Sequence, residues 1–203
     1  LVCRELPKTE RPARLYSIDS FAAGRALAVG EYPAQDGMGA RGLIYALDQG
    51  TWTSVTPVGL SGSWLLTAVD VSADGLGYMA GQDAAAGLLM RWDNGKLTRI
   101  DLPRYADAWT LFDLDCDERG QCLLAGAAHP GEGLLTLWRG ADLLDLNVMH
   151  PERTHAFQQV LRLQGGGFAL AGAGCSEPFG FVVVQQNAIQ QIAEFPELDG
   201  VLG

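Results

Sequence analysis

The sequence contains one unit of about 46 residues that occurs four times in succession, and this repeat limits the possible folds more than any other feature. Each copy contains a glycine followed by a mostly apolar run, and these leading glycines lie 45, 46 and 47 residues apart. They are Gly42, Gly87, Gly133 and Gly180. A constant period of roughly 20–50 residues is typical of solenoids and propellers, in which each unit buries its apolar face against the next. The chain is therefore expected to form an array of four similar units.

A second pattern precedes each leading glycine. Two glycines lie six residues apart in every copy: Gly24 and Gly30, Gly75 and Gly81, Gly120 and Gly126, Gly166 and Gly172. In front of each pair stands a charged residue between two uncharged ones: Ile18-Asp19-Ser20, Val69-Asp70-Val71, Leu114-Asp115-Cys116 and Leu161-Arg162-Leu163. Each unit thus predicts a strand, a glycine turn, a second strand, a loop, a third strand, a turn and a fourth strand.

Local signals favour strands over helices throughout the repeat. Asp93-Asn94-Gly95 is a hairpin signal, because the central residues of such a turn need positive φ. Residues 96–102 alternate apolar and polar side chains, and no segment combines helical spacing with helix caps. Four strands in about 45 residues is the content of a propeller blade. We therefore expect an all-β fold, a small β-propeller of four blades with four antiparallel strands each.

The expected blades cover residues 15–58, 65–103, 109–149 and 156–196 of a single domain that spans residues 1–203. Residues 1–7 are similar in character to residues 97–103 and are expected to form the outer strand of the closing blade. Residues 189–195 compete for the same place. Two alternatives stay open: a four-bladed ring closed by its own ends, and a set of blades cut from a larger ring.

The repeat also resembles the propeller repeats of secreted and surface bacterial proteins. The pattern that carries this resemblance is Ala-Val-Gly followed by Gly-x-Ile-Tyr-x-x-Asp-x-Gly-x-Trp, which here spans Ala28 to Gly30 and Gly42 to Trp52. The repeats that share it extend over nearly the whole chain. The resemblance implies a propeller and specifies no activity.

The formal net charge of −10 indicates which partners the surface repels. Phosphate backbones carry the same sign, so nucleic acid is not expected as a partner, whereas a basic protein would be attracted. No run of 18 apolar residues occurs, so no membrane-spanning helix is expected.

Four cysteines bear on the compartment. Cys116 and Cys122 flank a short turn and are expected to pair across it, and a Cys3–Cys175 bond would tie together the two ends of a ring. Two disulfides favour an oxidising compartment, the periplasm or the outside of the cell, with a leader removed ahead of Leu1. The alternative is four free thiols in a cytoplasmic protein.

The first strand of a blade lines the central channel of a propeller, which brings its charged residues near the axis. Asp19, Asp70 and Asp115 are expected at equivalent positions there, with Arg162 in the fourth place. Three carboxylates could hold Ca²⁺ or Na⁺, because hard cations prefer oxygen ligands. No other cofactor is expected. The alternative is that these side chains hydrogen-bond to the adjacent blades.

Partner-binding residues are expected at one face of the ring. Trp64 and Trp109 each precede an aspartate by six residues and are expected near the channel mouth, either as anchors for a sugar or a protein or as packing between blades. Tyr32 and Arg41 belong to the longest of the loops that join second and third strands, and His155 lies in a loop before the fourth blade. Variable loops on one side of a repeat array often carry function.

No nucleophile stands in a recognisable catalytic setting, so catalysis is not the expected activity. We expect a protein-interaction module that binds its partner through one propeller face, with inhibition or neutralisation of that partner as one form of the role. A carbohydrate-binding or glycoside-active propeller is the second hypothesis. The third is a set of blades within a larger surface assembly.

Overall fold

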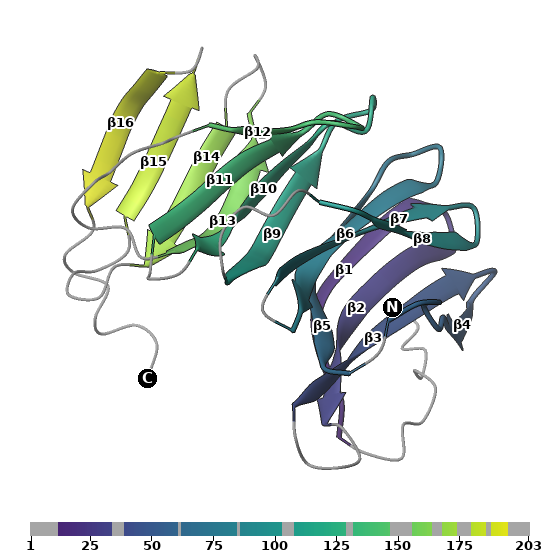
Figure 1. Ribbon diagram of the computed structural model, residues 1–203. Coiled ribbons are helices and arrows are strands. Elements are labelled where there is room, and N and C mark those ends of the chain that lie inside the picture. Colours follow the sequence, from purple (N-terminus) through teal and green to yellow (C-terminus); the bar gives the residue numbers. More distant parts are fainter. Residues whose placement is uncertain are drawn as a thin grey trace. The chain divides into compact units, whose positions relative to one another are not determined.

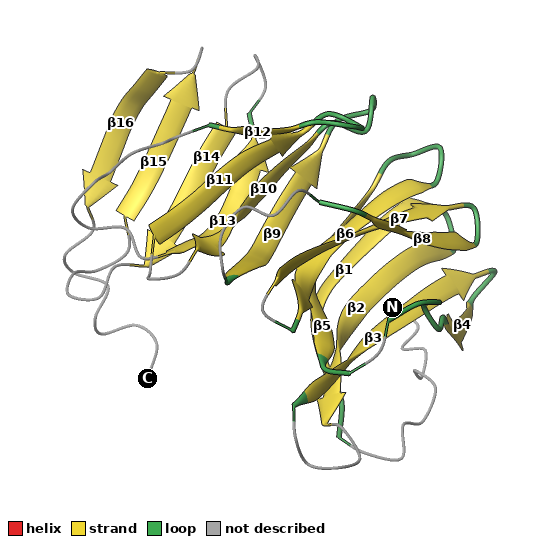
Figure 2. Ribbon diagram, in the orientation of Figure 1, coloured by secondary structure: helices red, strands yellow, loops and turns green. Residues whose placement is uncertain are grey.

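The computed structural model describes residues 12–33, 39–60, 62–84, 86–102, 108–128, 132–146, 156–163, 168–173, 180–185 and 188–194. Within these ranges the chain forms sixteen strands joined by turns and loops, and it contains no helix (Figure 2). The same ranges therefore hold no helix that could cross a membrane. The all-β expectation is confirmed.

The chain divides into two compact units, Leu1–Leu102 and Pro103–Gly203. Unit 1 contains eight connected strands, which form two antiparallel sets of four that pair in chain order and that we call sheets 1 and 2 (Figure 1). Sheet 1 consists of β1 (Arg14–Ala22), β2 (Arg25–Pro33), β3 (Ala40–Asp48) and β4 (Thr51–Ser54). Sheet 2 consists of β5 (Trp64–Val71), β6 (Leu76–Asp83), β7 (Ala86–Asp93) and β8 (Lys96–Ile100). One parallel bridge, Arg41 to Trp64, joins the two sheets.

Unit 2 repeats this arrangement. Sheet 3 consists of β9 (Trp109–Cys116), β10 (Cys122–Ala128), β11 (Glu132–Trp138) and β12 (Leu143–Asp145). Sheet 4 consists of β13 (Ala156–Arg162), β14 (Phe168–Ala173), β15 (Gly180–Gln185) and β16 (Ala188–Glu194). Among the described residues, strand pairing does not close the sheets into a ring. The closed ring of four blades therefore stays a prediction.

The first strand of every sheet contains a β-bulge at the same repeat position. The pairing of first and second strands skips one residue of the first strand each time: Tyr16, Thr67, Phe112 and Gln158. Next to each bulge, the second strand has the glycine that ends its apolar run. At Gly81, for example, a Cβ atom would collide with the carbonyl oxygen of Leu65, and Gly30 and Gly126 face the same obstacle. The repeated glycine is thus required by the backbone of the bulged strand.

The predicted hairpin at Asn94-Gly95 is confirmed. Both residues have positive φ, +46° and +98°, as a two-residue turn between twisted strands requires. The turn joins β7 to β8 and pairs Asp93 with Lys96.

Consecutive sheets within each unit pack face to face, because alternate side chains of a strand point to opposite sides. In unit 1 the core between the sheets contains Leu27, Val29 and Ile44 from sheet 1 and Leu66, Val69, Val71, Met79, Leu88, Met90 and Trp92 from sheet 2. In unit 2 the core contains Leu123, Ala125 and Leu135 from sheet 3 and Phe157, Val160 and Leu170 from sheet 4. Burial of these side chains is the main stabilising contribution to each pair of sheets.

Gly81→Ala is expected to destabilise the protein by more than about 3 kcal/mol, since the new methyl group would overlap the Leu65 carbonyl oxygen and β5 would have to move. Gly77→Ala in the same strand is the matched control, because its methyl group would meet the Val71 side chain at 3.2 Å, where a small shift suffices. Urea unfolding followed by circular dichroism measures both variants. Equal losses in the two would contradict the bulge as the reason for the glycine.

Candidate functional site

Two side chains of β1 bind the backbone of the next sheet. The Val69 amide donates to Ser17 Oγ at 3.3 Å, and the Val71 amide donates to Asp19 Oδ2 at 2.8 Å. Both amides lie on the edge of β5 that faces away from its partner strand β6. A buried amide without an acceptor costs about 1–3 kcal/mol of folding free energy. Ser17 and Asp19 avoid this cost by accepting from the two amides on the edge of β5.

Unit 2 shows the same arrangement at the same repeat positions. The Val160 amide donates to Asp113 Oδ2 at 2.9 Å, and the Arg162 amide donates to Asp115 Oδ2 at 2.6 Å. Asp113 stands two residues before Asp115, as Ser17 does before Asp19. In each unit, two acceptor side chains that stand two residues apart on the first strand of one sheet thus bind two amides, also two residues apart, on the first strand of the next sheet.

The structure corrects the expected place of Arg162. Asp115 pairs with Leu123, which stands three residues before Gly126, the glycine that faces the bulge. In sheet 4 the residue three before the equivalent glycine is Ala169, and it pairs with Leu161. Arg162 pairs with Phe168 instead. The expected alignment followed charge and not spacing: Asp115 stands five residues before Gly120, and the residue five before Gly166 is Leu161. The fourth place of the aspartate series is therefore Leu161.

Arg162 has a different role within unit 2. Its Nη2 donates to the carbonyl oxygen of Gln121 at 3.0 Å, and its guanidinium lies 3.7 Å from Asp115 and 3.8 Å from Asp117. Asp117 in turn accepts from the Arg119 and Gln121 amides, which shapes the turn between β9 and β10. The side chain thus fastens sheet 4 to the first turn of sheet 3.

The expected ion site was built on Asp19, Asp70 and Asp115. Both carboxylate oxygens of Asp19 accept backbone amides, Ser20 at 2.7 Å and Val71 at 2.8 Å. For Asp19 and Asp115 the structure thus shows the hydrogen bonding to an adjacent sheet that was the alternative reading. The described part of the chain contains no group of three His, Cys, Asp or Glu side chains that could hold a metal. A Ca²⁺ or Na⁺ ion at the three aspartates stays a prediction.

Among these capping side chains, Asp113 has a pKa that the fold changes. Burial raises the pKa of its carboxyl above the ordinary value, while the amides of Val160 and Leu114 oppose the rise and the nearby charge of Asp115 adds to it. A buried carboxylate at this position costs free energy that its amide partner only partly offsets.

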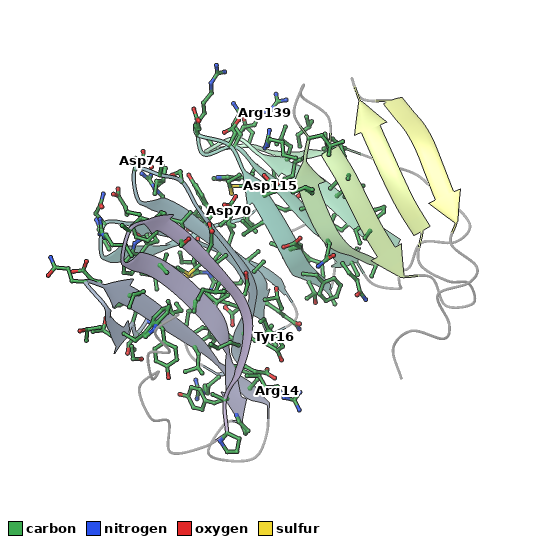
Figure 3. The ribbon with its side chains drawn as sticks, turned by 180° about the vertical axis from the view of Figure 1, so that it is seen from behind. Arg14, Tyr16, Asp70, Asp74, Asp115 and Arg139 are labelled. Carbon is green, nitrogen blue, oxygen red and sulfur yellow. A yellow bond between two sulfur atoms is a disulfide. The ribbon has the colours of Figure 1, made fainter. Side chains whose placement is uncertain are left out.

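Four polar or aromatic side chains of unit 1 lie at the end where β1, β3, β5 and β7 begin, which we call the entry end. Arg14 and Tyr16 are exposed there, and Tyr32 and Arg41 are half-buried. Tyr32 in β2 stands directly opposite Arg41 in β3. On the neighbouring strand, the Tyr16 hydroxyl donates to Glu31 Oε1 at 2.5 Å, and Arg14 lies beside Tyr16 at the start of β1 (Figure 3). Burial and the Glu31 carboxylate together raise the pKa of Tyr16. The phenol therefore stays a neutral donor at neutral pH.

Two hydrogen bonds of Ser63 and one ion pair connect neighbouring segments at the entry end. Ser63 Oγ accepts from the Ala40 amide at 3.1 Å and donates to the Ala40 carbonyl oxygen at 3.2 Å, which fixes the loop before β5 to the start of β3. An ion pair between Arg99 and Asp83, 2.5 Å apart, joins β8 to the end of β6. The side chains that a partner would meet thus stand on an ordered backbone.

The structure buries both predicted tryptophans. Trp64 packs on Gly42 at the start of β3, where a Cβ atom would collide with the indole, and it belongs to the core between sheets 1 and 2. This explains the leading glycine of the first repeat. Trp109 is buried as well. Both placements agree with a packing role for these tryptophans, which was the alternative to a role as binding anchors.

The Cys116–Cys122 disulfide is present and closes the β9–β10 hairpin, where the two residues are paired across the strands. The predicted positions Cys3, Cys175 and His155 lie outside the described residues. Sequence reasoning missed Ser17 and Asp113, although the alternation of side chains gave the signal: a polar residue two positions before a capping aspartate points to the same side.

No protein-family model matches the chain, and no curated protein matches it. Among solved structures, the chain is similar to one described as YCF48 bound to D1 peptide, with a TM-score of 0.65 and 12% sequence identity. The match covers 94% of this chain and 56% of that chain, so this chain spans about half the length of that protein. YCF48 from Cyanidioschyzon merolae is similar at a TM-score of 0.47, with 14% identity over 93% of this chain and 73% of that one. YCF48 is a β-propeller protein, and the first of these likenesses supports a propeller-repeat fold.

Asp113→Asn is expected to stabilise the protein at neutral pH and to lose that advantage in acid. The folded pKa lies above the ordinary value of 3.8, so the free energy of unfolding of the wild type falls as the pH rises through this raised pKa. The asparagine oxygen still accepts the Val160 amide but carries no charge to bury.

Urea unfolding at several pH values between about 3.5 and 7.5 measures the difference between variant and wild type. Asp142→Asn, which removes an exposed carboxylate from the same unit, is the control. A difference that does not change with pH, or that favours the wild type at neutral pH, would show that the buried charge of Asp113 has no such cost.

Proposed function

We propose that this protein is a non-catalytic binding module that holds a protein partner at the entry end of unit 1. The observation that carries the proposal is the cross-strand pair of Tyr32 and Arg41, with Tyr16 on the adjacent strand, on a backbone fixed by Ser63. Tyrosine and arginine are enriched among the residues that dominate binding energy at protein interfaces.

The chemistry of the entry end suits a polypeptide. Tyr16 and Tyr32 offer flat apolar surface with a polar tip, and a partner can pack on such rings without ordering many torsions. Arg14 and Arg41 add donors that match carboxylates and backbone carbonyl groups, in a chain whose overall charge is negative. An extended segment with carbonyl or carboxylate acceptors is therefore the partner that we propose.

The likeness to YCF48 supports the choice of partner class. That propeller was solved with a bound peptide, and the present chain shares its fold over 94% of the chain length. A propeller-repeat scaffold that takes up a peptide is thus a physical precedent for the binding mode that we propose here.

Three further proposals concern the setting of this function. The four sheets act as consecutive blades of one propeller, either alone or within a larger surface assembly. The protein works in the periplasm or outside the cell, and the Cys116–Cys122 disulfide supports this, because such bonds persist in oxidising compartments. Binding at the entry end inhibits or neutralises the partner by occupying its surface.

A peptide selected on the immobilised chain from a random phage-displayed library provides the test. Tyr32→Ala and Arg41→Ala are each expected to weaken its binding about tenfold, because each removes a central contact. Fluorescence polarisation with the labelled peptide measures the dissociation constants. The control is Arg91→Ala, which removes an arginine that pairs with Asp93 at the opposite end of unit 1.

Equal affinity in the wild type and in both entry-end variants would place the contact elsewhere and contradict the proposed site. An equal loss in Arg91→Ala would mean that the peptide responds to total charge and not to the entry end. Selection that returns no binding peptide would count against the function itself.

A further inference from the structure

Sheet 1 keeps apolar side chains of its first strand exposed at positions that are buried in the other sheets. Ile18 is 62% exposed and Leu15 41%. The residues at the same repeat positions have exposures of 7% or less: Val69, Leu114 and Val160 for Ile18, and Leu66, Leu111 and Phe157 for Leu15. The difference is confined to sheet 1, the first sheet of the array.

Sheet 4 has an exposed apolar residue on its opposite side. Leu161 is 60% exposed and occupies the position that Asp19 and Asp115 hold in sheets 1 and 3. At those positions the side chain points to the following sheet, as the bonds to Val71 and Arg162 show. Leu161 therefore points to the place where a following sheet would lie.

The two exposed surfaces are the two complementary sides of one recurring interface. Val69 and Val160 lie on the side that packs against the preceding sheet, and Ile18 holds the same position in sheet 1. Asp19 and Asp115 lie on the side that contacts the following sheet, and Leu161 holds that position in sheet 4. Among the described residues of its own unit, sheet 1 has no sheet against the first kind of surface, and sheet 4 has none against the second.

The hydrogen-bonding groups of the two surfaces also match. At the interfaces already formed, an aspartate accepts the amide of Val71 or of Arg162. The corresponding amide in sheet 1 belongs to Ser20, and it already donates to Asp19 Oδ1 at 2.7 Å. A leucine opposite Ser20 therefore leaves no amide without an acceptor. Gln159 stands two residues before Leu161, at the repeat position where Ser17 and Asp113 accept amides of the next sheet. Its side-chain carbonyl oxygen is an acceptor at the same place.

We propose that a second copy of this chain covers the exposed surface of sheet 1 with its own sheet 4. The contact is head-to-tail, with Ile18 of one copy beside Leu161 of the other. Interfaces of this kind close when the rotation allows it. Two copies joined at both ends contain eight sheets, which lies within the range of about 4–8 blades that propellers adopt. The solved propeller in the YCF48 peptide complex is itself longer than this chain, which covers 56% of it.

Sedimentation of the chain over concentrations from about 1 to 100 µM tests the proposal, because association depends on mass action. The wild type is expected to reach twice the monomer mass of 21.7 kDa. Ile18→Asp and Leu161→Asp are each expected to weaken the association at least about tenfold, since each places a charge in an apolar contact. Val58→Asp, at a residue that is 90% exposed in the loop after β4, is the matched control and is expected to behave as the wild type.

Mixing the two variants separates this head-to-tail contact from arrangements in which sheet 1 meets sheet 1 or sheet 4 meets sheet 4. Each variant keeps one intact surface, so an equimolar mixture of Ile18→Asp and Leu161→Asp is expected to form a heterodimer that neither variant forms alone. Both must keep the wild-type circular dichroism spectrum, and Ile18→Ser replaces Ile18→Asp if that variant does not fold. A wild type that stays monomeric, single variants that associate as the wild type does, or a mixture that stays monomeric overturns the proposal.

Discussion

The structure depends on the capping of backbone amides at one strand edge by side chains of the preceding sheet. An antiparallel sheet of four strands leaves its first strand with a largely unpaired edge, and amides on that edge need acceptors once the next sheet buries them. Ser17 and Asp19 meet this need in unit 1, and Asp113 and Asp115 meet it in unit 2. Because each bond joins the first sheet of a unit to the second, the same contacts fix the order and the spacing of the two sheets within each unit.

Capping with carboxylates has a cost that depends on burial. Asp113 shows it as a raised pKa, since removal from water disfavours the charged form. Ser17 performs the same bond without a charge and at a longer distance, 3.3 Å against 2.9 Å. Asp19 uses its second oxygen for the Ser20 amide, which spreads the charge over two donors. The series shows how one backbone requirement can be met by different side chains, each with its own balance of bond strength and desolvation.

The sequence predicted the repeat, the strands and the hairpin turns, because these rest on local spacing and on glycine. It did not predict why Gly30, Gly81 and Gly126 recur, since the bulge that faces them is a property of two paired strands. The misplacement of Arg162 has another cause, because the expected alignment followed charge and not spacing. Asp19, Asp70 and Asp115 each stand five residues before the turn glycine of their repeat, and in the fourth repeat that residue is Leu161. The strand register agrees with this spacing. At the entry end, the bond from Tyr16 to Glu31 joins residues 15 apart, and no local pattern reports it.

The two ends of unit 1 differ in how much the length and sequence of their connections can vary. At the end opposite the entry end, β1–β2, β3–β4 and β7–β8 are joined by two-residue turns that place Gly24, Gly50 and Gly95 at positive φ. Such turns set the register of the strands, so a change in their length would shift every side chain to the other face. At the entry end β6 and β7 are also joined by two residues, but two connections are longer, six residues between β2 and β3 and nine between β4 and β5. Sequence can change there without disturbing the capped first strands or the core. If the proposed partner binds at this end, its specificity can evolve while the scaffold stays constant.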